Sequence, residues 1–367
     1  MNILHLVPSA KFSGVHSFVL NYYQHIDRKK FHFDLLKRGN ELGIPSQFSA
    51  RDFGIQHLPE KSSPDKDKVV KEILASGYDA FHIHTSFWQG FWLEEKAKEV
   101  GIPKIIVHSH STSIAGIEEE TRREELRKRH FILREKLSPE VATDFLACSK
   151  EASEWLFGTR IPKKQIHLIK NAIDVELYGY NSDTRIKLRS QLGISDSFVL
   201  GTTGGFWNSK NPYFLLEVFR EFHHKHLDAK LLYIGEGPKK QEIENHIKEL
   251  NLEDSILVLG FQENIQDFLQ AMDCYLLPSL FEGMPISLIE AASAGLPCLA
   301  SDRITQEVET VENITRLPLD IPTWIQALDR MIDKPISRPK GVEVVRAAGY
   351  DIKKQVKVLE DLYLGKL

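Results

Sequence analysis

The sequence predicts an α/β protein with two doubly wound domains, each a parallel sheet with helices on both faces. Three observations point to this class. Short apolar runs alternate with longer amphipathic stretches, which is typical of a parallel sheet connected by helices. The alternation is interrupted by a polar stretch at Asn171–Ser197 and then starts again. The chain has 367 residues, a length that suits two domains.

The first series alternates apolar runs with helical patterns. The predicted strands are Ile3–Val7, Phe33–Lys37, Ala80–His84, Ile105–His108, Asp144–Ala147 and Ile166–Ile169. The predicted helices are His16–His25, Lys66–Ala75, Phe91–Glu99, Glu118–Lys136 and Lys150–Leu156. The segment Met1–Pro8 has neither a basic region nor a cleavage site, so it is predicted to be a strand and not a signal peptide.

The second series repeats the pattern. Its predicted strands are Ser197–Thr202, Leu231–Ile234, Ile256–Leu259, Cys274–Leu277 and Pro297–Ala300, and its predicted helices are Pro212–Phe222, Lys239–Leu250, Asn264–Gln270 and Ile286–Ser293. The tail Asp351–Leu364 has apolar residues at helical spacing. We therefore expect one domain over residues 1–177, a second over 178–350, and a final helix over 351–367 that can pack back on the first domain.

Composition excludes several classes of protein. Apolar residues make up 42% and charged residues 27% of the chain, as in ordinary folded proteins. A net charge of −4 argues against nucleic-acid binding, which needs a basic face. No apolar run is long enough to span a membrane. Cys148, Cys274 and Cys298 form neither a zinc pattern nor a disulfide framework, so a reducing, cytoplasmic location is expected.

The most informative segment is Phe281–Ala292, which follows a predicted strand and enters a helix. Glu282 lies in the loop and Glu290 lies about one turn inside the helix. Carboxylates there can accept hydrogen bonds from sugar hydroxyls, while the N–H groups at the helix start can hold a diphosphate. The alternative is a capping acid and a surface acid on an ordinary helix. The loop residues expected to meet the diphosphate are Gly283, Met284, Pro285 and Ile286.

This segment resembles the E-x7-E motif of the retaining glycosyltransferases of family 4. Pro278-Ser279 before it and Ala300–Glu307 after it also match that family. The resemblance implies the GT-B fold, in which two Rossmann-like domains face each other across a cleft. It covers nearly the whole chain and is strongest for enzymes that build capsular polysaccharides and exopolysaccharides. It implies that Glu290 binds the ribose hydroxyls of a nucleotide sugar and that Glu282 contacts the donor sugar.

A second segment, Gly201–Pro212, leaves the first strand of the second domain and enters a helix. The family usually has an arginine and then a lysine here, and both grip the diphosphate. Lys210 matches the lysine, but Gly205 stands where the arginine is expected. We expect Gly204 and Lys210 to bind the donor, with one cation fewer unless Arg303 or another residue supplies it. An ordinary surface lysine is the alternative for Lys210.

In the first domain, two segments follow strands. Gly14 opens a helix and can approach a phosphate closely, and His16 is expected to contact the acceptor; a plain turn glycine is the alternative. By the resemblance, His110 lies near the donor sugar and the acceptor, where it can hydrogen-bond a sugar hydroxyl. The patterns His82-Ile83-His84 and His108-Ser109-His110 together could suggest zinc, but no set of carboxylates accompanies them. We therefore expect no metal, and strand histidines that are packed or hydrogen-bonded.

Two further features concern the acceptor. Trp88 follows a strand and either stacks on an acceptor sugar or packs in the core. The segment Thr121–Lys136 has seven Lys or Arg residues against three Glu. A basic helix of this kind suits docking on a membrane surface that carries a lipid-linked acceptor. The alternative is a solvated helix with ion pairs between neighbouring turns.

The resemblance implies a retaining hexosyltransferase of surface polysaccharide biosynthesis. It would move sugar from a UDP-hexose or UDP-N-acetylhexosamine to a saccharide acceptor that is lipid-linked, without a metal cofactor, in the cytoplasm or at the inner surface of the cytoplasmic membrane. His110 and Glu282 are the expected catalytic residues. Two alternatives remain open at this point: a nucleotide-sugar epimerase of the same fold, and a non-catalytic partner that binds a nucleotide sugar.

Overall fold

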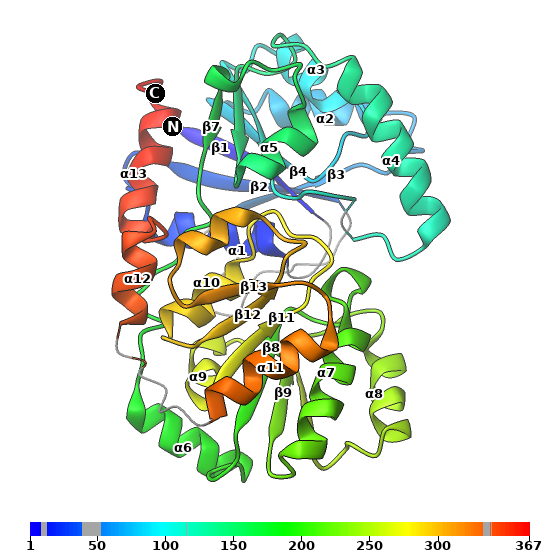
Figure 1. The fold of residues 1–367 in the computed structure, drawn as a ribbon. Helices are drawn as coiled ribbons and strands as arrows, with labels where there is room; N and C mark the ends of the chain where they lie inside the picture. The colour runs from blue at the N-terminus through cyan, green and yellow to red at the C-terminus, as the bar shows by residue number, and fades with distance from the viewer. Residues whose placement is uncertain (9–12, 39–52, 115, 333–337, 339) are drawn as a thin grey trace. The chain divides into compact units, whose positions relative to one another are not determined.

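A computed structural model describes residues 1–8, 13–38, 53–114, 116–332, 338 and 340–367 (Figure 1). Contacts within the chain divide it into two compact units. Unit 1 comprises Met1–Ala172 and Ile352–Leu367, and unit 2 comprises Ile173–Asp351. The division falls after residue 172, five residues before the expected boundary. All of the polar linker after Asn171 and Ala172 therefore belongs to unit 2.

Unit 1 is built on a parallel sheet with the strand order β3-β2-β1-β4-β5-β6-β7. The strands are β1 (Asn2–Val7), β2 (His32–Arg38), β3 (Gly54–Leu58), β4 (Ala80–Thr85), β5 (Lys104–Ser109), β6 (Asp144–Ala147) and β7 (Ile166–Leu168). The strands of the first predicted series are all present. Strand β3 was not predicted, because its sequence has no apolar run.

Helices of unit 1 come from both ends of the chain. They are α1 (Gly14–His25), α2 (Lys66–Leu74), α3 (Trp92–Glu99), α4 (Glu120–Glu135), α5 (Lys150–Phe157) and α13 (Ile352–Tyr363), with a short 3-10 helix η1 (Lys163–Gln165). The C-terminal α13 packs against α1 (Figure 1). Its Glu360 accepts a hydrogen bond from the backbone N–H of Asp27 at 2.9 Å. The last helix of the chain is thus part of the first unit.

Unit 2 repeats the doubly wound order, β10-β9-β8-β11-β12-β13. Its parallel strands are β8 (Val199–Thr203), β9 (Lys230–Ile234), β10 (Ile256–Gly260), β11 (Cys274–Leu277), β12 (Cys298–Ser301) and β13 (Ile314–Leu317). Strand β13 was not predicted, since Thr315 and Arg316 interrupt its apolar residues.

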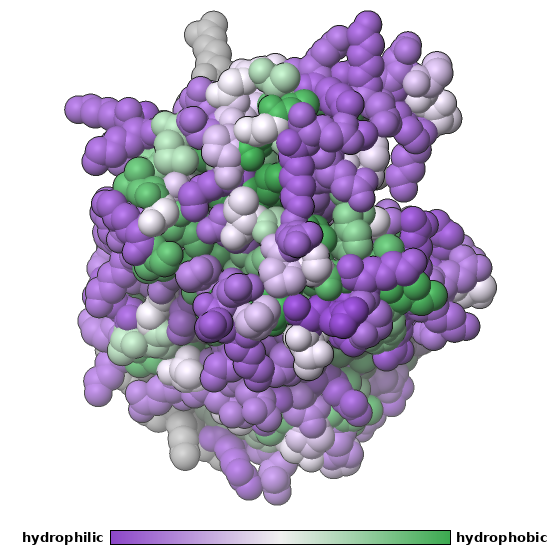
Figure 2. Space-filling view, turned by 90° about the horizontal axis from the view of Figure 1, so that it is seen from above, coloured by the Kyte–Doolittle hydropathy of each residue, from purple (hydrophilic) through white to green (hydrophobic). Residues whose placement is uncertain are grey.

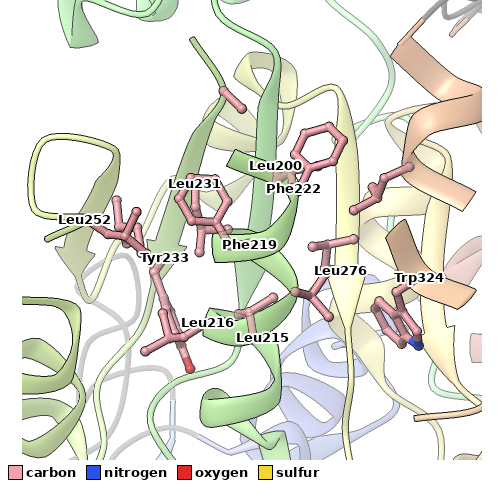
Figure 3. Packing of buried hydrophobic residues seen from close by; sticks show 14 of the residues in the cluster. Leu200, Leu215, Leu216, Phe219, Phe222, Leu231, Tyr233, Leu252, Leu276 and Trp324 are labelled. Carbon is pink, nitrogen blue, oxygen red and sulfur yellow. The ribbon is translucent and has the colours of Figure 1, made fainter. Parts of the chain in front are cut away.

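Unit 2 is completed by its helices. They are α6 (Ser182–Leu192), α7 (Pro212–Lys225), α8 (Lys240–Glu249), α9 (Ile265–Ala271), α10 (Ile286–Ser293), α11 (Ile321–Ile332) and α12 (Gly341–Ala347), with the 3-10 helices η2 (Asn208–Lys210) and η3 (Gln306–Thr310). Figure 3 shows its core, where Leu200 and Leu276 from the sheet meet Phe219 of α7 and Trp324 of α11. Removing these large apolar side chains from water is the main force that holds the layers together.

The surface fits an ordinary folded protein. The face drawn in Figure 2 is mostly hydrophilic, and its hydrophobic residues are scattered. Cys148, Cys274 and Cys298 are buried, and no disulfide joins them. No helix in the described ranges is both long enough and apolar enough to cross a membrane.

Both sheets place their functional loops by the same rule. In an open parallel sheet, ligands bind beyond the carboxyl ends of the strands, where the strand order reverses. That point lies between β1 and β4 in unit 1 and between β8 and β11 in unit 2. The sequence motifs follow these strands.

Candidate functional site

In unit 2, two motifs predicted separately meet at one point. Lys210 ends η2, which follows β8, and Glu282 lies in the loop after the neighbouring strand β11. The Nζ atom of Lys210 lies 2.5 Å from Oε1 of Glu282, which also accepts a hydrogen bond from the Ser279 hydroxyl at 3.0 Å. About one fifth of each charged side chain is exposed, 21% for Lys210 and 18% for Glu282. The pair is therefore ordered yet open to a charged ligand.

The loop then enters α10. Gly283, Met284 and Pro285 are buried and lead directly to Ile286, the first residue of the helix. Proline at the N-cap has no side chain that could cap the helix. The N–H groups of a first helical turn have no partner inside their own helix, and the helix dipole is positive there. This end of α10 can bind an anion beside the cation of Lys210.

Glu290 lies one turn into α10 and is half-buried. Its Oε1 accepts a hydrogen bond from the hydroxyl of Tyr178 at 2.9 Å. Burial raises the pKa of Glu290 to about 7, and the bond from Tyr178 acts against that rise. Burial and the nearby Glu290 carboxylate raise the pKa of Tyr178, so this phenol stays protonated and donates.

Tyr178 was not predicted as a site residue, because it lies in the polar linker. Nothing in that stretch marks the tyrosine, and its bond to Glu290 spans 112 positions. The linker is held against α10 by the Ser293 hydroxyl, which donates to the carbonyl of Val175 at 3.0 Å. Only the fold brings the two elements together.

The structure gives a reason for the glycine that replaces the expected arginine. Gly204 and Gly205 have φ of +135° and +83°, which side chains rarely adopt. A Cβ on Gly205 would lie 2.1 Å from the carbonyl oxygen of Glu236, in the loop after β9. That loop is tied to the first one, because the N–H of Phe206 donates to the same oxygen at 3.2 Å. No side chain fits at position 205 on this backbone.

The glycine loop instead lies against Lys210. A Cβ on Gly204 would be 3.1 Å from Cε of Lys210, so the lysine stem passes directly over the loop. Arg303, the suggested substitute for the missing arginine, is exposed, and its Nε lies 3.7 Å from Oδ1 of Asp302. This ion pair does not connect Arg303 to the Lys210–Glu282 pair.

In unit 1, the loop after β1 caps α1. The Ser13 hydroxyl accepts a hydrogen bond from the backbone N–H of His16 at 3.5 Å and lies 2.9 Å from its Nδ1. No described atom would lie within 4 Å of a Cβ on Gly14. His16 is buried, and burial together with the charge of Lys37 lowers its pKa to about 4. His16 is therefore a neutral imidazole at pH 7.

His110 follows β5 and is the outer member of a chain of three imidazoles. Its Nε2 lies 2.8 Å from Nδ1 of His84, and Nε2 of His84 lies 2.9 Å from Nδ1 of His5. Burial lowers the pKa of His110 and of His5 to about 3, and burial also lowers the pKa of His84. All three rings are neutral at pH 7. The two inner histidines were not predicted as site residues, although the pattern His82-Ile83-His84 was the available signal.

A second histidine pair lies on the same face of the sheet. Nε2 of His82 lies 3.2 Å from Nδ1 of His108, and Nδ1 of His82 lies 2.8 Å from the Tyr363 hydroxyl of α13. Ligand atoms in the sets His5, His82, His84 and His84, His108, His110 lie within 4.8 Å of one another. These hydrogen bonds are of the kind expected for packed, hydrogen-bonded strand histidines.

Trp88 lies in the core of unit 1. It is 2% exposed, and its indole N–H donates to the carbonyl of Leu156 at 2.8 Å. Its backbone N–H donates to Nδ1 of His130 at 3.1 Å. A ring in this position cannot stack on a sugar, so burial favours the core alternative over acceptor binding.

Helix α4 carries the basic segment. Three of its arginines pair with glutamates one turn away: Arg122 with Glu125, Arg123 with Glu120, and Arg127 with Glu124. These pairs correspond to the alternative of a solvated, ion-paired helix. Lys128 and Ile132 lie four residues apart on the helix and are both exposed, Ile132 by 60%.

Comparisons with known proteins agree across the whole chain. Residues 12–177 match the family model described as Glycosyltransferase Family 4, and residues 163–351 match the model described as Glycosyl transferases group 1. The putative glycosyltransferase EpsF of Bacillus subtilis is 30% identical over 376 residues, which cover 98% of this chain and 96% of that protein.

Two further similarities extend this finding. The Escherichia coli UDP-Gal:alpha-D-GlcNAc-diphosphoundecaprenol alpha-1,3-galactosyltransferase is 27% identical over 385 residues, 99% of this chain and 97% of its own. Among solved structures, Anabaena HepE in complex with UDP and glucose has a TM-score of 0.79 at 17% identity and covers 100% of both chains. At this identity the structural likeness bears on the fold alone.

Proposed function

The chain belongs to the family 4 glycosyltransferases and has their GT-B fold, and we propose that it transfers a sugar from a UDP-sugar to a saccharide acceptor. The donor is a UDP-hexose or a UDP-N-acetylhexosamine, and the product enters a surface polysaccharide. The observation that carries the proposal is the Lys210–Glu282 pair beside the start of α10. It joins a cation, a helix N-terminus and a carboxylate at the ends of two adjacent strands.

Each of these groups has a role that its chemistry suits. Lys210 exchanges Glu282 for the diphosphate and stabilises the charge of the departing UDP. Glu282, released from the lysine, accepts a hydrogen bond from a hydroxyl of the donor sugar. Glu290 accepts hydrogen bonds from the ribose hydroxyls. Gly204 and the loop residues Gly283, Met284, Pro285 and Ile286 let the backbone approach the phosphates.

Unit 1 supplies the groups that face the sugar and the acceptor. His110 contacts the donor sugar, Gly14 lies at a helix start near the phosphates, and His16 contacts the acceptor. Transfer proceeds with retention: the acceptor hydroxyl attacks from the face that the diphosphate leaves, and an oxygen of the departing phosphate takes the hydroxyl proton. The proposed reaction needs no metal cofactor, because Lys210 and the N–H groups of α10 meet the leaving-group charge.

We propose that the acceptor is linked to a lipid diphosphate, as the name of the Escherichia coli relative states for that protein. Helix α4 supports a peripheral contact with the anionic inner membrane surface. Lys128, Ile132 and Lys136 follow one another at four-residue spacing, so one face presents two cations around an exposed apolar side chain. Co-sedimentation with anionic vesicles checks this contact, and Lys128→Glu with Ile132→Ser should reduce it.

The experiment that tests the function measures donor binding first. Thermal shift is recorded with UDP, UDP-galactose, UDP-glucose, UDP-N-acetylglucosamine, UDP-N-acetylgalactosamine, GDP-mannose and NADH. Ligands that bind the folded state raise its melting temperature by mass action. We expect shifts with UDP and with at least one UDP-sugar, and none with NADH. A shift with NADH alone would contradict the proposal.

Transfer is then measured as UDP release with a GlcNAc-diphospho-lipid acceptor, and the product anomer is read by NMR. Transfer with an unchanged anomeric configuration is the expected result. A control with the UDP-sugar alone separates the alternatives: an epimerised nucleotide sugar would indicate an epimerase. Binding without turnover toward any acceptor tested would indicate a non-catalytic partner.

A further inference from the structure

Three imidazoles, those of His5, His84 and His110, form one continuous hydrogen-bonded chain on the face of the sheet that carries α1. They come from β1, β4 and the end of β5, three adjacent strands. Phe18 of α1 lies against His84 and His110, with ring centroids 5.7 Å and 5.2 Å away. His5 is fully buried and His110 is only half-buried. The chain therefore runs from the interior of unit 1 to the carboxyl edge of its sheet.

Counting protons shows that this chain has two orientations. A neutral imidazole has one N–H and one bare nitrogen. His84 uses both of its nitrogens, so it donates at one and accepts at the other. If it donates toward His5, then Nε2 of His5 carries a proton and Nδ1 of His110 is bare. If it donates toward His110, then Nδ1 of His110 carries a proton and Nε2 of His5 is bare.

The two orientations differ in where the unsatisfied N–H lies. Nε2 of His5 and Nδ1 of His110 are shielded from solvent and have no hydrogen-bond partner among the described residues. Leaving a buried donor unpaired is costly, and such groups need an explanation. At His5 the N–H would stay unpaired within the sheet. At His110, which is partly exposed beyond the end of β5, the N–H lies nearer the surface, so the second orientation is the less costly one.

We propose that His84, supported by His5, is a positioning residue that holds His110 as the Nδ1–H tautomer, so that His110 donates a hydrogen bond to an oxygen of the donor sugar. This proposal rests on the proposed function. The donor nitrogen is already out of water, so it gives up no hydrogen bond to solvent when it meets the sugar. The imidazole acts as a neutral hydrogen-bond donor, and no proton leaves it.

The geometry favours this network over a metal site. A tetrahedral zinc ion with bonds of about 2.0–2.1 Å holds its ligand nitrogens about 3.3 Å apart. The pairs His84–His110 and His5–His84 are 2.8 Å and 2.9 Å apart, which is hydrogen-bond distance. The nitrogens bond to each other, so the rings would have to separate to admit an ion.

Nitrogen NMR of the full chain labelled with 15N-histidine reads the tautomer directly. His110 is assigned by comparison with His110→Asn, and spectra are recorded for the protein alone, with UDP and with UDP-galactose. We expect His110 protonated at Nδ1 and bare at Nε2 in the sugar-bound protein. In His84→Leu that tautomer should lose its preference. Detection of the Nε2–H tautomer or of a charged ring in the wild type would overturn the proposal.

Kinetics test the positioning role with a matched pair of variants. His84→Leu should lower kcat about tenfold while KM for the UDP-sugar changes little, because the donor to His110 is lost but the diphosphate site is intact. His84→Asn keeps an amide N–H near the position of Nδ1 and should recover most of kcat. Equal loss in both variants, or a change confined to KM, would contradict a positioning role.

His82→Asn is the control for general damage to this buried face. His82 bonds His108 and Tyr363, so the change removes buried hydrogen bonds of the same kind without touching the bond to His110. We expect a lower melting temperature and a kcat within about twofold of the wild type. Stoichiometric zinc in the purified protein, lost in His84→Asn, would replace the network with a metal site.

Failure of the proposed function can be distinguished from failure of the positioning proposal. If no UDP-sugar binds and no transfer occurs, the proposed function fails, whereas the tautomers of His84 and His110 are still read from the protein alone. If transfer occurs but His110 has the opposite tautomer, only the positioning proposal fails.

Discussion

The two units share a strand order but carry opposite chemistry at matching places. In unit 2, the loops after β8 and β11 bring Lys210 together with Glu282, and Glu290 follows in α10. In unit 1, the corresponding strands β1 and β4, with β5 beside them, end in imidazoles such as His84 and His110. One site is built of ions and the other of neutral rings.

In the proposed function, this difference divides the work of the transfer reaction between the two units. The doubly wound sheet fixes where a ligand meets the chain, at the carboxyl ends of the central strands. The side chains decide which part of the ligand each unit can stabilise. A cation suits the diphosphate, and uncharged imidazoles suit sugar hydroxyls and oxygens. We therefore expect changes in unit 2 to act mainly through charge, and to have the largest effects.

The first prediction tests that ranking at Lys210. Replacing it with methionine keeps the volume of the side chain and removes the charge that we propose meets the departing diphosphate. We expect kcat/KM for the UDP-sugar to fall about 10²–10³-fold, which corresponds to about 3–4 kcal/mol of transition-state stabilisation. Steady-state UDP release measures it.

Lys225→Met is the matched control for this change. Lys225 is an exposed lysine near the end of α7, paired with Asp329 at 2.9 Å, far along the helix from the glycine loop. We expect its activity to stay within about twofold of the wild type, because surface pairs contribute little. A loss below about threefold in Lys210→Met would mean that another group meets the diphosphate.

The second prediction compares the two glycine loops. Gly205 has a φ of +83° and its Cβ position lies 2.1 Å from the Glu236 carbonyl oxygen, whereas no described atom lies within 4 Å of the Cβ position of Gly14. We expect Gly205→Ala to destabilise unit 2 by about 2–3 kcal/mol through strain and clash. Gly14→Ala should change stability by less than about 1 kcal/mol.

Thermal unfolding measures both variants. A loss of 2–3 kcal/mol in a unit of this size corresponds to a melting temperature lower by about 4–12 °C. If Gly205→Ala melted with the wild type, the loops would not be interlocked as described, and the missing arginine would lose its structural explanation. If Gly14→Ala melted much lower, the space found around the Cβ position of Gly14 among the described residues would be the incorrect part.

Much of this architecture was predictable because it is encoded locally. Central strands such as β8 are short apolar runs, and Glu282 and Glu290 stand in one continuous segment with the loop that positions them. Lys210 was predicted from the resemblance, because it stands where the family has a lysine, between a strand and a proline-started helix. The spacing alone could not show that Lys210 and Glu282, 72 positions apart, form one ion pair.

Other features depend on contacts that no local pattern records. Tyr178 reaches Glu290 only after the polar linker folds against α10. An aromatic residue after a strand can either pack in the core or stack on a sugar. The burial of Trp88 favours the core. The missing arginine at Gly205 looked like a lost cation in the sequence, whereas the Glu236 backbone occupies its space.

The smallest predicted effect comes from pH and belongs to Glu290. Burial raises its pKa to about 7, so the carboxyl is about half protonated at pH 7. Only the carboxylate can accept from both ribose hydroxyls, so its contribution to UDP affinity should fall about tenfold between pH 8 and pH 6. Isothermal titration calorimetry measures it. Because UDP also titrates, the ratio of wild-type to Glu290→Gln affinity at each pH isolates the carboxyl.

Tyr178→Phe sharpens the same measurement. The bond from Tyr178 favours the carboxylate, so its loss should move the midpoint of that ratio to higher pH. The pH dependence of stability is an independent check on the pKa of Glu290. The pKa of Glu290 is about 7 in the folded protein, against an ordinary value of 4.5, so this group's contribution to stability declines as pH rises from about 4.5 to about 7 and is constant above. A ratio that does not change with pH would mean that Glu290 does not bind ribose as a carboxylate, and the charged half of the comparison would then rest on Lys210 and Glu282 alone.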